Sequence, residues 1–515
     1  MVFRTKTVFP RIVCALAVCM GVVHCSHADA NVWKVGSQEE WVANTEELLR
    51  IEIVEGMAKP TEKTATFRSV LKRFDEKQSA ESIVIEQSPV WDNWQPVEDI
   101  GPGCTFDSPV LLSLGPKNYW FFARHNKGAE NDSWDSSKGQ FEAKEVKLDG
   151  FDMPLLTTPI PNQFRARGGI NPSLGGYHAW ESRDMVNWVH HGPITDKDSA
   201  WMTTAEYVDG KAYFYYDFPN DQDPHLIIDD NLTDGAVGEK MGMAFADPSH
   251  GSDCGIIRDL NGNFHVIYED WNPIHANSHS FDSPLAGHAV SKDGKGDFKI
   301  LAPAVDKRTR PTGVIKTYKH PHWVLEDPER FKTDIGEYEV HEPEQDCFGD
   351  WSAICIGGQY YLFGDYDPAG AHGTKGSQVS VARFTSSSLD KEFEFCGKLG
   401  RGHPDPDICF AEGRFYLATQ METDYTSPGP WVESVEVRVG VDTTNDGKID
   451  KWTSWQPVQE SYDYTPGFVK HVKRTPAQLD LRSLPAGYGF QYELKITDTT
   501  ENKSKPIIDE VSVTF

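Results

Sequence analysis

The sequence lacks long apolar segments and has little positive charge. Its longest apolar stretch, residues 12–23, is too short to span a bilayer, and no later run approaches about 18 residues, so no membrane insertion is expected. Lysine and arginine together number 50, against 78 aspartates and glutamates, which gives a formal net charge of −28. Bulk electrostatics therefore argues against nucleic acid or an anionic membrane surface as a partner.

Cysteine is also scarce. Three of the nine cysteines precede residue 31, and the other six are too few to form a disulfide scaffold in a chain of 515 residues. No Cys-x-x-Cys or mixed Cys/His spacing predicts a zinc site. If the chain is exported, one or two disulfides are compatible with this number of cysteines, and the sequence does not assign their pairing. The six cysteines are Cys104, Cys254, Cys347, Cys355, Cys396 and Cys409.

Residues 1–30 are interpreted as a signal peptide, which predicts a secreted or periplasmic protein. Three basic residues precede the apolar segment 12–23, and Ala28-Asp29-Ala30 then supplies the small-x-small cleavage pattern. A lipoprotein signal at Cys25 is the alternative, although His24 stands where a small residue is expected. Removing the signal peptide takes away three basic residues and one acid, which leaves a net charge of −30.

One pattern recurs five times: an apolar strand, a tight turn containing glycine, and a strongly aromatic strand. Such turns supply positive φ angles, and alternating aromatic residues suit a half-buried face, so each copy predicts a β-hairpin. Outer strands lie between several copies, and four strands in each of five units predict an all-β five-bladed β-propeller. A two-sheet sandwich would not explain five copies. The copies are Pro109–Phe122, Glu206–Tyr216, Gly255–Tyr268, Ala353–Phe363 and Ile408–Ala418.

The expected domain organisation places the propeller between two terminal segments. The tail has strand-like runs that either complete the last blade or form a small sandwich. A long insertion spans about residues 271–348, and the best helix candidate is Ser37–Glu55, with Ser37 as N-cap and Glu40 at N3. The divisions are 1–30 signal peptide, 31–95 N-terminal arm, 96–431 propeller catalytic domain and 432–515 C-terminal β extension.

Aspartates stand at one register relative to the turn glycines. Asp107, Asp350 and Asp405 lie eight residues before the glycine, and Asp253 lies nine before it; the second copy breaks the rule, and its first acid is Glu206. The inner strands of a propeller start around one funnel, so these carboxylates are expected to converge there. Packed carboxylates repel one another unless they bind a cation, a sugar or a proton. Asp residues that cap turns are the alternative explanation.

A histidine and two tryptophans complete the predicted site. His403 lies between acidic residues at the expected funnel mouth, where their charge would keep the imidazole protonated as a candidate acid. Trp201 and Trp351 flank the aspartates and are candidates for stacking on a sugar ring. A surface-loop histidine and core tryptophans are the alternatives. Asp405 and Glu206 join the tryptophans as predicted substrate-binding residues.

The segment Asp442-x-Thr444-x-Asp446-Gly447 is similar to the start of a calcium loop. Its twelfth position is Thr453 rather than a bidentate acid, and a turn rich in Asp and Asn is the alternative. The predicted chemistry requires no cofactor, and a structural Ca²⁺ at Asp442 and Asp446 stays open.

The blade pattern, the Asp107-Ser-Pro segment and the run Gly402–Asp407 resemble the five-bladed propeller glycoside hydrolases of families 43 and 32. The chain is most similar in character to family 117, the exo-acting α-1,3-(3,6-anhydro)-L-galactosidases of marine bacteria. The resemblance covers about residues 90–425. It implies that Asp107 is the general base, that His403 is the acid, and that Asp350 or else Asp253 supports the acid.

The chain also departs from family 117. Its insertion before Asp350 is long, its C-terminal extension is large, and the family's helical N-terminal dimerisation segment has no clear counterpart, so a homodimer stays open. The expected function is a secreted glycoside hydrolase that removes terminal sugars from oligosaccharides of a marine or algal polysaccharide. The alternatives are a polysaccharide lyase, in which His403 and a tyrosine abstract a proton next to a uronate, and a glycan-binding propeller whose aspartates hold a structural cation.

Overall fold

The computed structural model describes residues 31–86, 94–97, 100, 107–124, 176–196, 201–217, 224–245, 251–270, 285–302, 304–305, 347–367, 380–400, 405–420, 424–426, 434–497 and 507–515. The predicted signal peptide and most of the insertion at 271–348 lie outside these residues. Within them, no helix is both long and apolar enough to cross a membrane.

Most of the described chain forms five antiparallel sets of four strands. The fourth set belongs to a six-stranded sheet, because β32 (Phe468–Thr475) and β31 (Ser461–Thr465) extend it beyond its first strand. The first set is β9 (Asp107–Gly115), β10 (Asn118–Arg124), β11 (Tyr177–Ser182) and β12 (Trp188–Pro193). The second is β13 (Trp201–Val208), β14 (Lys211–Asp217), β15 (Pro224–Asp229) and β16 (Glu239–Met243). The third is β17 (Gly251–Arg258), β18 (Phe264–Asp270), β19 (Leu285–Ser291) and β20 (Lys299–Ile300). The fourth is β21 (Cys347–Ile356), β22 (Gln359–Asp367), β23 (Ser380–Ser386) and β24 (Glu394–Leu399). The fifth is β25 (Asp407–Ala411), β26 (Arg414–Ala418), β27 (Asp424–Thr426) and β8 (Gln95–Val97).

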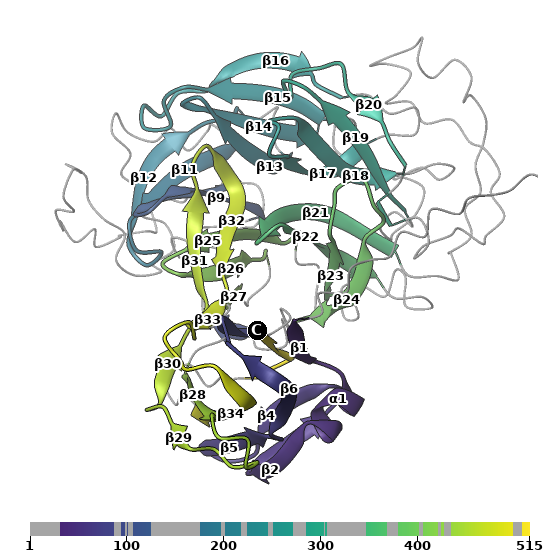
Figure 1. The fold of residues 1–515 in the computed structure, drawn as a ribbon. Coiled ribbons are helices and arrows are strands. Elements are labelled where there is room, and N and C mark those ends of the chain that lie inside the picture. The colour runs from purple at the N-terminus through teal and green to yellow at the C-terminus, as the bar shows by residue number, and fades with distance from the viewer. Residues whose placement is uncertain are drawn as a thin grey trace, which may run out of the picture.

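The first strands of the five sheets lie in a closed ring. Each of β9, β13, β17, β21 and β25 contacts the next, and β25 returns to β9 (Figure 1). The ring closes at the fifth sheet, where β8 pairs with β27 although it precedes β9 in the chain. These contacts confirm the predicted all-β propeller, and the described residues form five blades.

The predicted inner hairpins are confirmed as the first two strands of each blade. Three of their turns join paired residues across two positions, and both positions have positive φ: Asp209-Gly210, Gly357-Gly358 and Glu412-Gly413. Positive φ at both positions is the conformation whose twist matches that of the flanking strands, and Gly and Asp adopt it readily. The local sequence therefore determined these hairpins.

The two terminal segments form one β-sandwich, although the sequence divided them into an arm and an extension. One sheet has the order β1-β35-β7-β33, and the other has the order β2-β5-β34-β28-β29 with β30 and β6 attached. Both sheets contribute to one apolar core that contains Trp41, Phe67 and Tyr492. Each sheet takes strands from both segments, so neither segment completes a sheet alone and the core requires both. Figure 1 shows the purple N-terminal and yellow C-terminal strands interleaved below the propeller.

The terminal sandwich and its hairpins are built from one helix and fifteen strands, of which β34, with 11 residues, is the longest. The N-terminal elements are β1 (Val32–Val35), α1 (Gln38–Ala43), β2 (Thr45–Leu49), β3 (Ile51–Val54), β4 (Met57–Pro60), β5 (Thr64–Ser69), β6 (Lys72–Gln78) and β7 (Ser82–Glu86). The C-terminal elements are β28 (Val435–Asp442), β29 (Lys451–Trp452), β30 (Gln456–Val458), β31 (Ser461–Thr465), β32 (Phe468–Thr475), β33 (Ala477–Asp480), β34 (Gly487–Thr497) and β35 (Glu510–Thr514).

The helix predicted over Ser37–Glu55 is shorter than expected. It begins as predicted, because the Ser37 side chain accepts a hydrogen bond from the Glu40 backbone and the Glu40 side chain accepts one from Ser37. It ends at Ala43, where the chain turns into β2 and β3. These strands pair with β5 and β4, and this sheet pairing overrides the helical pattern of the segment.

Candidate functional site

The inner strands bulge where the predicted aspartates stand. In blades 3 and 4, two residues of the inner strand oppose one residue of the second strand, and Asp253 and Asp350 are the first residues of these bulges. Asp405 precedes β25 at the equivalent position. All three have positive φ, of 42°, 49° and 39°. Bulges re-aim side chains at the rims of sheets, and aspartate tolerates this conformation better than most residues.

Asp107 lies one position earlier than these three in the pairing register. It begins β9 opposite Arg124, as Gly349 lies opposite Asp365 in blade 4. Counting back from the turn glycine suggested the same position for all of them. The count misplaces Asp107 because Gly115 is still paired with Asn118 in the strand, whereas Gly358 lies within the turn. The side chain of Asp107 lies outside the described residues.

A second set of acids ends the second strands on the same face as the bulges. Asp217, Glu269 and Asp365 are buried and occupy equivalent positions in blades 2, 3 and 4. Two of them hold the bulge of the next blade. The Asp405 backbone N–H donates to Asp365 Oδ1 at 3.0 Å, and the Asp253 N–H donates to Asp217 Oδ2 at 3.2 Å.

The sequence reasoning did not select these three acids. A signal was present, because each directly follows the aromatic run of a second strand or lies one residue beyond it. An acid at the end of an apolar strand marks the point where that strand reaches the funnel.

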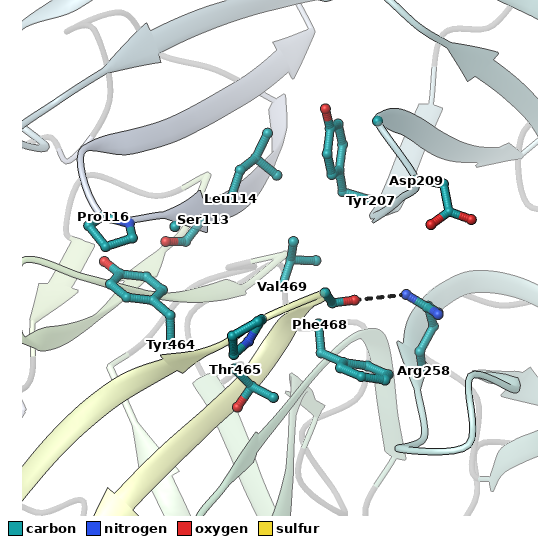
Figure 2. Close-up of a pocket in the computed structure, with 14 residues that line it drawn as sticks. Ser113, Leu114, Pro116, Tyr207, Asp209, Arg258, Tyr464, Thr465, Phe468 and Val469 are labelled. Carbon is teal, nitrogen blue, oxygen red and sulfur yellow. Dashed lines mark hydrogen bonds between the residues drawn. The ribbon is translucent and has the colours of Figure 1, made fainter.

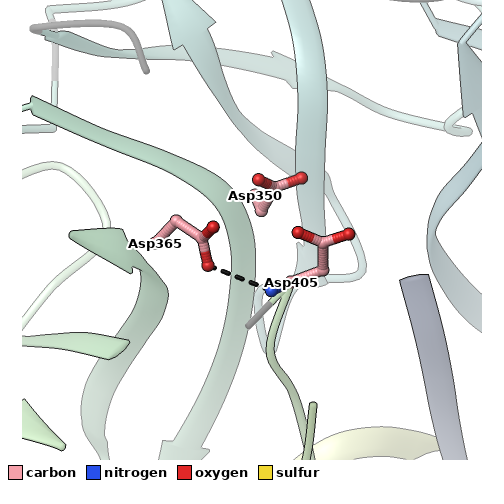
Figure 3. Close-up of side chains that lie close together, drawn as sticks. All are labelled: Asp350, Asp365 and Asp405. Atoms are coloured by element: carbon pink, nitrogen blue, oxygen red, sulfur yellow. Dashed lines mark hydrogen bonds between the residues drawn. The ribbon is translucent and has the colours of Figure 1, made fainter. Parts of the chain in front are cut away.

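Three carboxylates gather between blades 4 and 5. Each of Asp350, Asp365 and Asp405 places one oxygen within 4.8 Å of the others. Figure 3 shows the three carboxylates close together. Asp365 is fully buried (0% exposed), and the other two are half-buried. Two unit charges at this separation repel by about 3–4 kcal/mol at an effective dielectric constant near 20. A proton, a cation such as Ca²⁺ or a sugar hydroxyl at this cluster would relieve that repulsion.

Other predicted site residues lie elsewhere in the fold. Trp351 follows Asp350 in the bulge, but it is 1% exposed and packs against Phe348 and Phe384 in the core between blades 3 and 4. The structure therefore gives it a packing position instead of the expected stacking position, because the bulge that turns Asp350 outward turns the next residue inward. His403 and the side chain of Trp201 lie outside the described residues.

Glu206 is buried (1% exposed) near the propeller axis, so it has no surface on which a substrate could bind. Burial raises the pKa of Glu206, and the Lys470 ammonium is the largest charge opposing that shift. The pKa of Asp407 is raised by burial and opposed by Lys470 in the same way. Burial disfavours a carboxylate that has no opposite charge nearby. Glu206, which the sequence predicted to bind substrate, therefore belongs to a buried group of charges with Asp407 and Lys470.

The predicted calcium loop is closed on itself. Asp442 accepts hydrogen bonds from the backbone N–H groups of Thr444, Asn445 and Gly447, at 2.7–3.1 Å. Asp446 accepts one from Lys448 at 2.9 Å. This is the geometry of an Asx-type turn. Among the described residues, the Asp350, Asp365 and Asp405 cluster is the group of acidic, His or Cys ligands gathered closely enough for a metal ion.

A separate cavity of about 670 Å³ lies on the opposite side of the propeller, at the inner-hairpin turns. Figure 2 shows it between the turns of blades 1 and 2 and the tip of the β31–β32 hairpin, where Arg258 donates to the Gly467 carbonyl at 3.0 Å. Tyr207 and Asp209 also line it. Its position separates it from the aspartate cluster. No disulfide joins the described cysteines Cys254, Cys355, Cys396 and Cys409.

No protein-family model matches the chain, and a search of curated proteins finds no match. Among solved structures it is similar to a β-xylosidase, RS223, at 12% identity over 64% of this chain and 94% of the other, with a TM-score of 0.35. It is similar to an endo-arabinase from Bacteroides thetaiotaomicron at 10% identity over 63% and 93%, with a TM-score of 0.35. A further one is a GH43_1 enzyme from Xanthomonas citri complexed with xylose, at 12% identity over 65% and 89%, with a TM-score of 0.36. Family 43 is one of the families that the sequence resembles, while the fold itself is established by the ring of sheets.

Proposed function

We propose that this protein is an exported glycoside hydrolase whose active site lies at the bulged starts of the inner strands. The observation that carries the proposal is the gathering of Asp350, Asp365 and Asp405 from two neighbouring blades. Glycoside hydrolysis needs a group that protonates the leaving oxygen and a carboxylate that activates water or attacks the sugar. A site with several carboxylates at close range can hold such groups in different protonation states.

The cluster is too compact to contain both partners of an inverting mechanism. Inverting enzymes separate their two carboxyl groups by about 6.5–9.5 Å to leave room for water. One oxygen of each acid lies within 4.8 Å of the others, and we propose that these acids act as one unit on one side of the sugar. We therefore propose that Asp350, supported by Asp365 and Asp405, orients the general acid and keeps it protonated. His403 is the proposed acid, and Asp107, from blade 1, is the proposed base.

The substrate class follows from the resemblance noted in the sequence. We propose terminal sugars of oligosaccharides from a marine or algal polysaccharide, released outside the cytoplasm. A glycan-binding propeller is the second candidate, and it is favoured by the same cluster, because three carboxylates can also hold a structural cation.

The test is sugar release from oligosaccharides of agar, carrageenan, arabinan and xylan, followed by chromatography. Wild type is compared with Asp107→Asn, Asp350→Asn and the control Asp230→Asn, an exposed aspartate of blade 2. We expect release by wild type and the control, and a loss of at least about 100-fold in the other two variants. Equal release by all four proteins would refute the assignment. Binding without release, abolished by a chelator, would support the second candidate, and products with a new double bond would identify a lyase.

A further inference from the structure

A hairpin from the C-terminal segment closes the axis of the propeller. Strands β31 and β32 leave the terminal sandwich, and β32 pairs in parallel with the end of β21, Cys355 with His471 and Ile356 with Val472. Strand β32 also contacts β9, β13, β17 and β25. One strand therefore touches the inner strand of every blade, as the yellow hairpin across the propeller in Figure 1 illustrates.

Lys470, on β32, places its ammonium group between the inner strands. It is 3% exposed, and its Nζ donates to Thr204 Oγ1 at 3.0 Å and to the Ile256 carbonyl at 2.7 Å. Thr204 Oγ1 also accepts from the Ile256 N–H at 3.2 Å. The lysine thereby joins the inner strands of blades 2 and 3.

Asp407 performs the matching task for the other three blades. It is 3% exposed, its Oδ2 accepts from the Leu111 N–H of blade 1 at 2.6 Å, and its Oδ1 accepts from Ser352 Oγ of blade 4 at 2.6 Å. The same Oδ1 accepts from its own neighbour, the Ile408 N–H, at 2.9 Å. An ionised carboxylate makes stronger hydrogen bonds than a neutral acid. The Lys470 ammonium favours the ionised form, because it lowers the pKa of Asp407 against the effect of burial.

We infer that Lys470 is a positioning residue for the site at the bulged starts of the inner strands. Its contacts and those of Asp407 fix the five inner strands just beyond the bulges. Ser352 lies two residues after Asp350, Asp407 two residues after Asp405, and Leu111 four residues after Asp107. A shift in this layer therefore displaces the bulged aspartates. The catalytic part of the inference rests on the proposed function, while the structural coupling does not.

The terminal sandwich is thus part of the catalytic unit. Its hairpin supplies Lys470, whose positive charge is the largest one that lowers the pKa of both Glu206 and Asp407 against the effect of burial. Removing one partner of a buried charge cluster leaves the other charges uncompensated, which costs more than the cluster contributes when intact. The inner strands would then relax away from the geometry seen here.

The test compares Lys470→Met, which keeps length but removes charge, with Lys470→Arg, which keeps charge. The control is Lys473→Met, an exposed lysine three residues later on the same strand. Hydrogen exchange is followed by mass spectrometry in peptides covering residues 107–115, 347–356 and 405–411. We expect faster exchange in all three peptides for Lys470→Met, values near wild type for Lys470→Arg, and no change for the control. On the oligosaccharide that wild type cleaves, kcat should fall about 10- to 100-fold with KM nearly unchanged.

Wild-type exchange rates in Lys470→Met would overturn the inference, whatever happens to activity. If wild type releases no sugar, the exchange result still decides whether Lys470 positions the strands, so the two proposals fail separately. If Lys470→Met does not fold, Thr204→Val decides the question, because it keeps the lysine and removes the hydroxyl that accepts from Lys470 Nζ. It should then loosen residues 201–208 and 251–258, the two strands that Lys470 joins, and unchanged exchange there would contradict the inference.

Discussion

Replacement of Trp351 separates a packing role from a sugar-binding role. The ring is 1% exposed and lies over Gly364, where a Cβ atom would come within 3.2 Å of it. A buried tryptophan removes about 200 Å² from water, which at about 25 cal/mol per Å² corresponds to about 5 kcal/mol. Trp351→Ala should therefore cost about 3–5 kcal/mol of unfolding free energy. Trp351→Phe keeps most of the ring area and should cost about 2 kcal/mol.

Urea titration and thermal melting measure these losses. The unfolding entropy is about 2.1 cal/mol/K per residue, so for a domain of about 330 residues about 2 kcal/mol corresponds to a fall of roughly 3 °C in Tm. The matched control is Trp455→Phe, because Trp455 is half-buried in the terminal sandwich and packs against Arg438. We expect a change below about 1 kcal/mol there. In the sugar-release assay, Trp351→Phe should keep the wild-type KM.

A different pattern would show that the packing argument is wrong. If Trp351→Phe melts like wild type and its KM rises about tenfold, the ring is exposed in solution and contacts the sugar. The sequence-based stacking assignment would then stand.

Three further predictions concern strand spacing, acidity and the loop at Asp442. A Cβ atom at Gly255 would lie 2.5 Å from the Trp351 carbonyl oxygen, so Gly255→Ala should push blades 3 and 4 apart. The variant should lose about 1–3 kcal/mol of unfolding free energy in urea titration and lower kcat more than it alters KM. Unchanged stability would contradict this contact. Burial, followed by the neighbouring His265, lowers the pKa of His288 to about 3, whereas an unfolded histidine titrates near 6.5. Between these two pKa values the unfolded chain binds one more proton than the folded chain, so the free energy of unfolding falls as the pH falls. At pH 5 this histidine accounts for a loss of about 2 kcal/mol. His288→Asn should lack that part of the acid sensitivity when urea titrations at pH 7 and pH 5 are compared. Asp442→Ala should lower the Tm equally with calcium and with a chelator, because its carboxylate caps backbone N–H groups; a loss confined to the calcium sample would support a calcium loop instead.

Local patterns in the sequence were sufficient for the hairpins. The turn residues at Asp209-Gly210 and Glu412-Gly413 specify the backbone twist, and aromatic alternation marks the half-buried face. The Ser37 capping box likewise predicted the start of α1, since its hydrogen bonds join residues three apart. The predicted helix ran too far because a local signal was missed: Glu55-Gly56 forms the same kind of two-residue turn, with positive φ at both positions, between β3 and β4.

The aspartate register also came from local spacing, because a bulge repeats at the same place in similar hairpins. Asp253, Asp350 and Asp405 proved equivalent even in backbone conformation. The spacing gave no information on which side of the bulge faces the core. Trp351 and Glu206 were therefore predicted beside the substrate although both are buried.

The sequence alone determined the repeating hairpin and the positions of its acids, since both depend on residues a few positions apart. Only the tertiary structure decided which acids meet. Asp365 lies beside Asp405 because blades 4 and 5 pack face to face over a shared apolar core. Lys470 reaches Thr204, 266 residues away, because the C-terminal hairpin closes the ring. Such distances depend on how five sheets close around one axis, and that closure is a property of the whole chain.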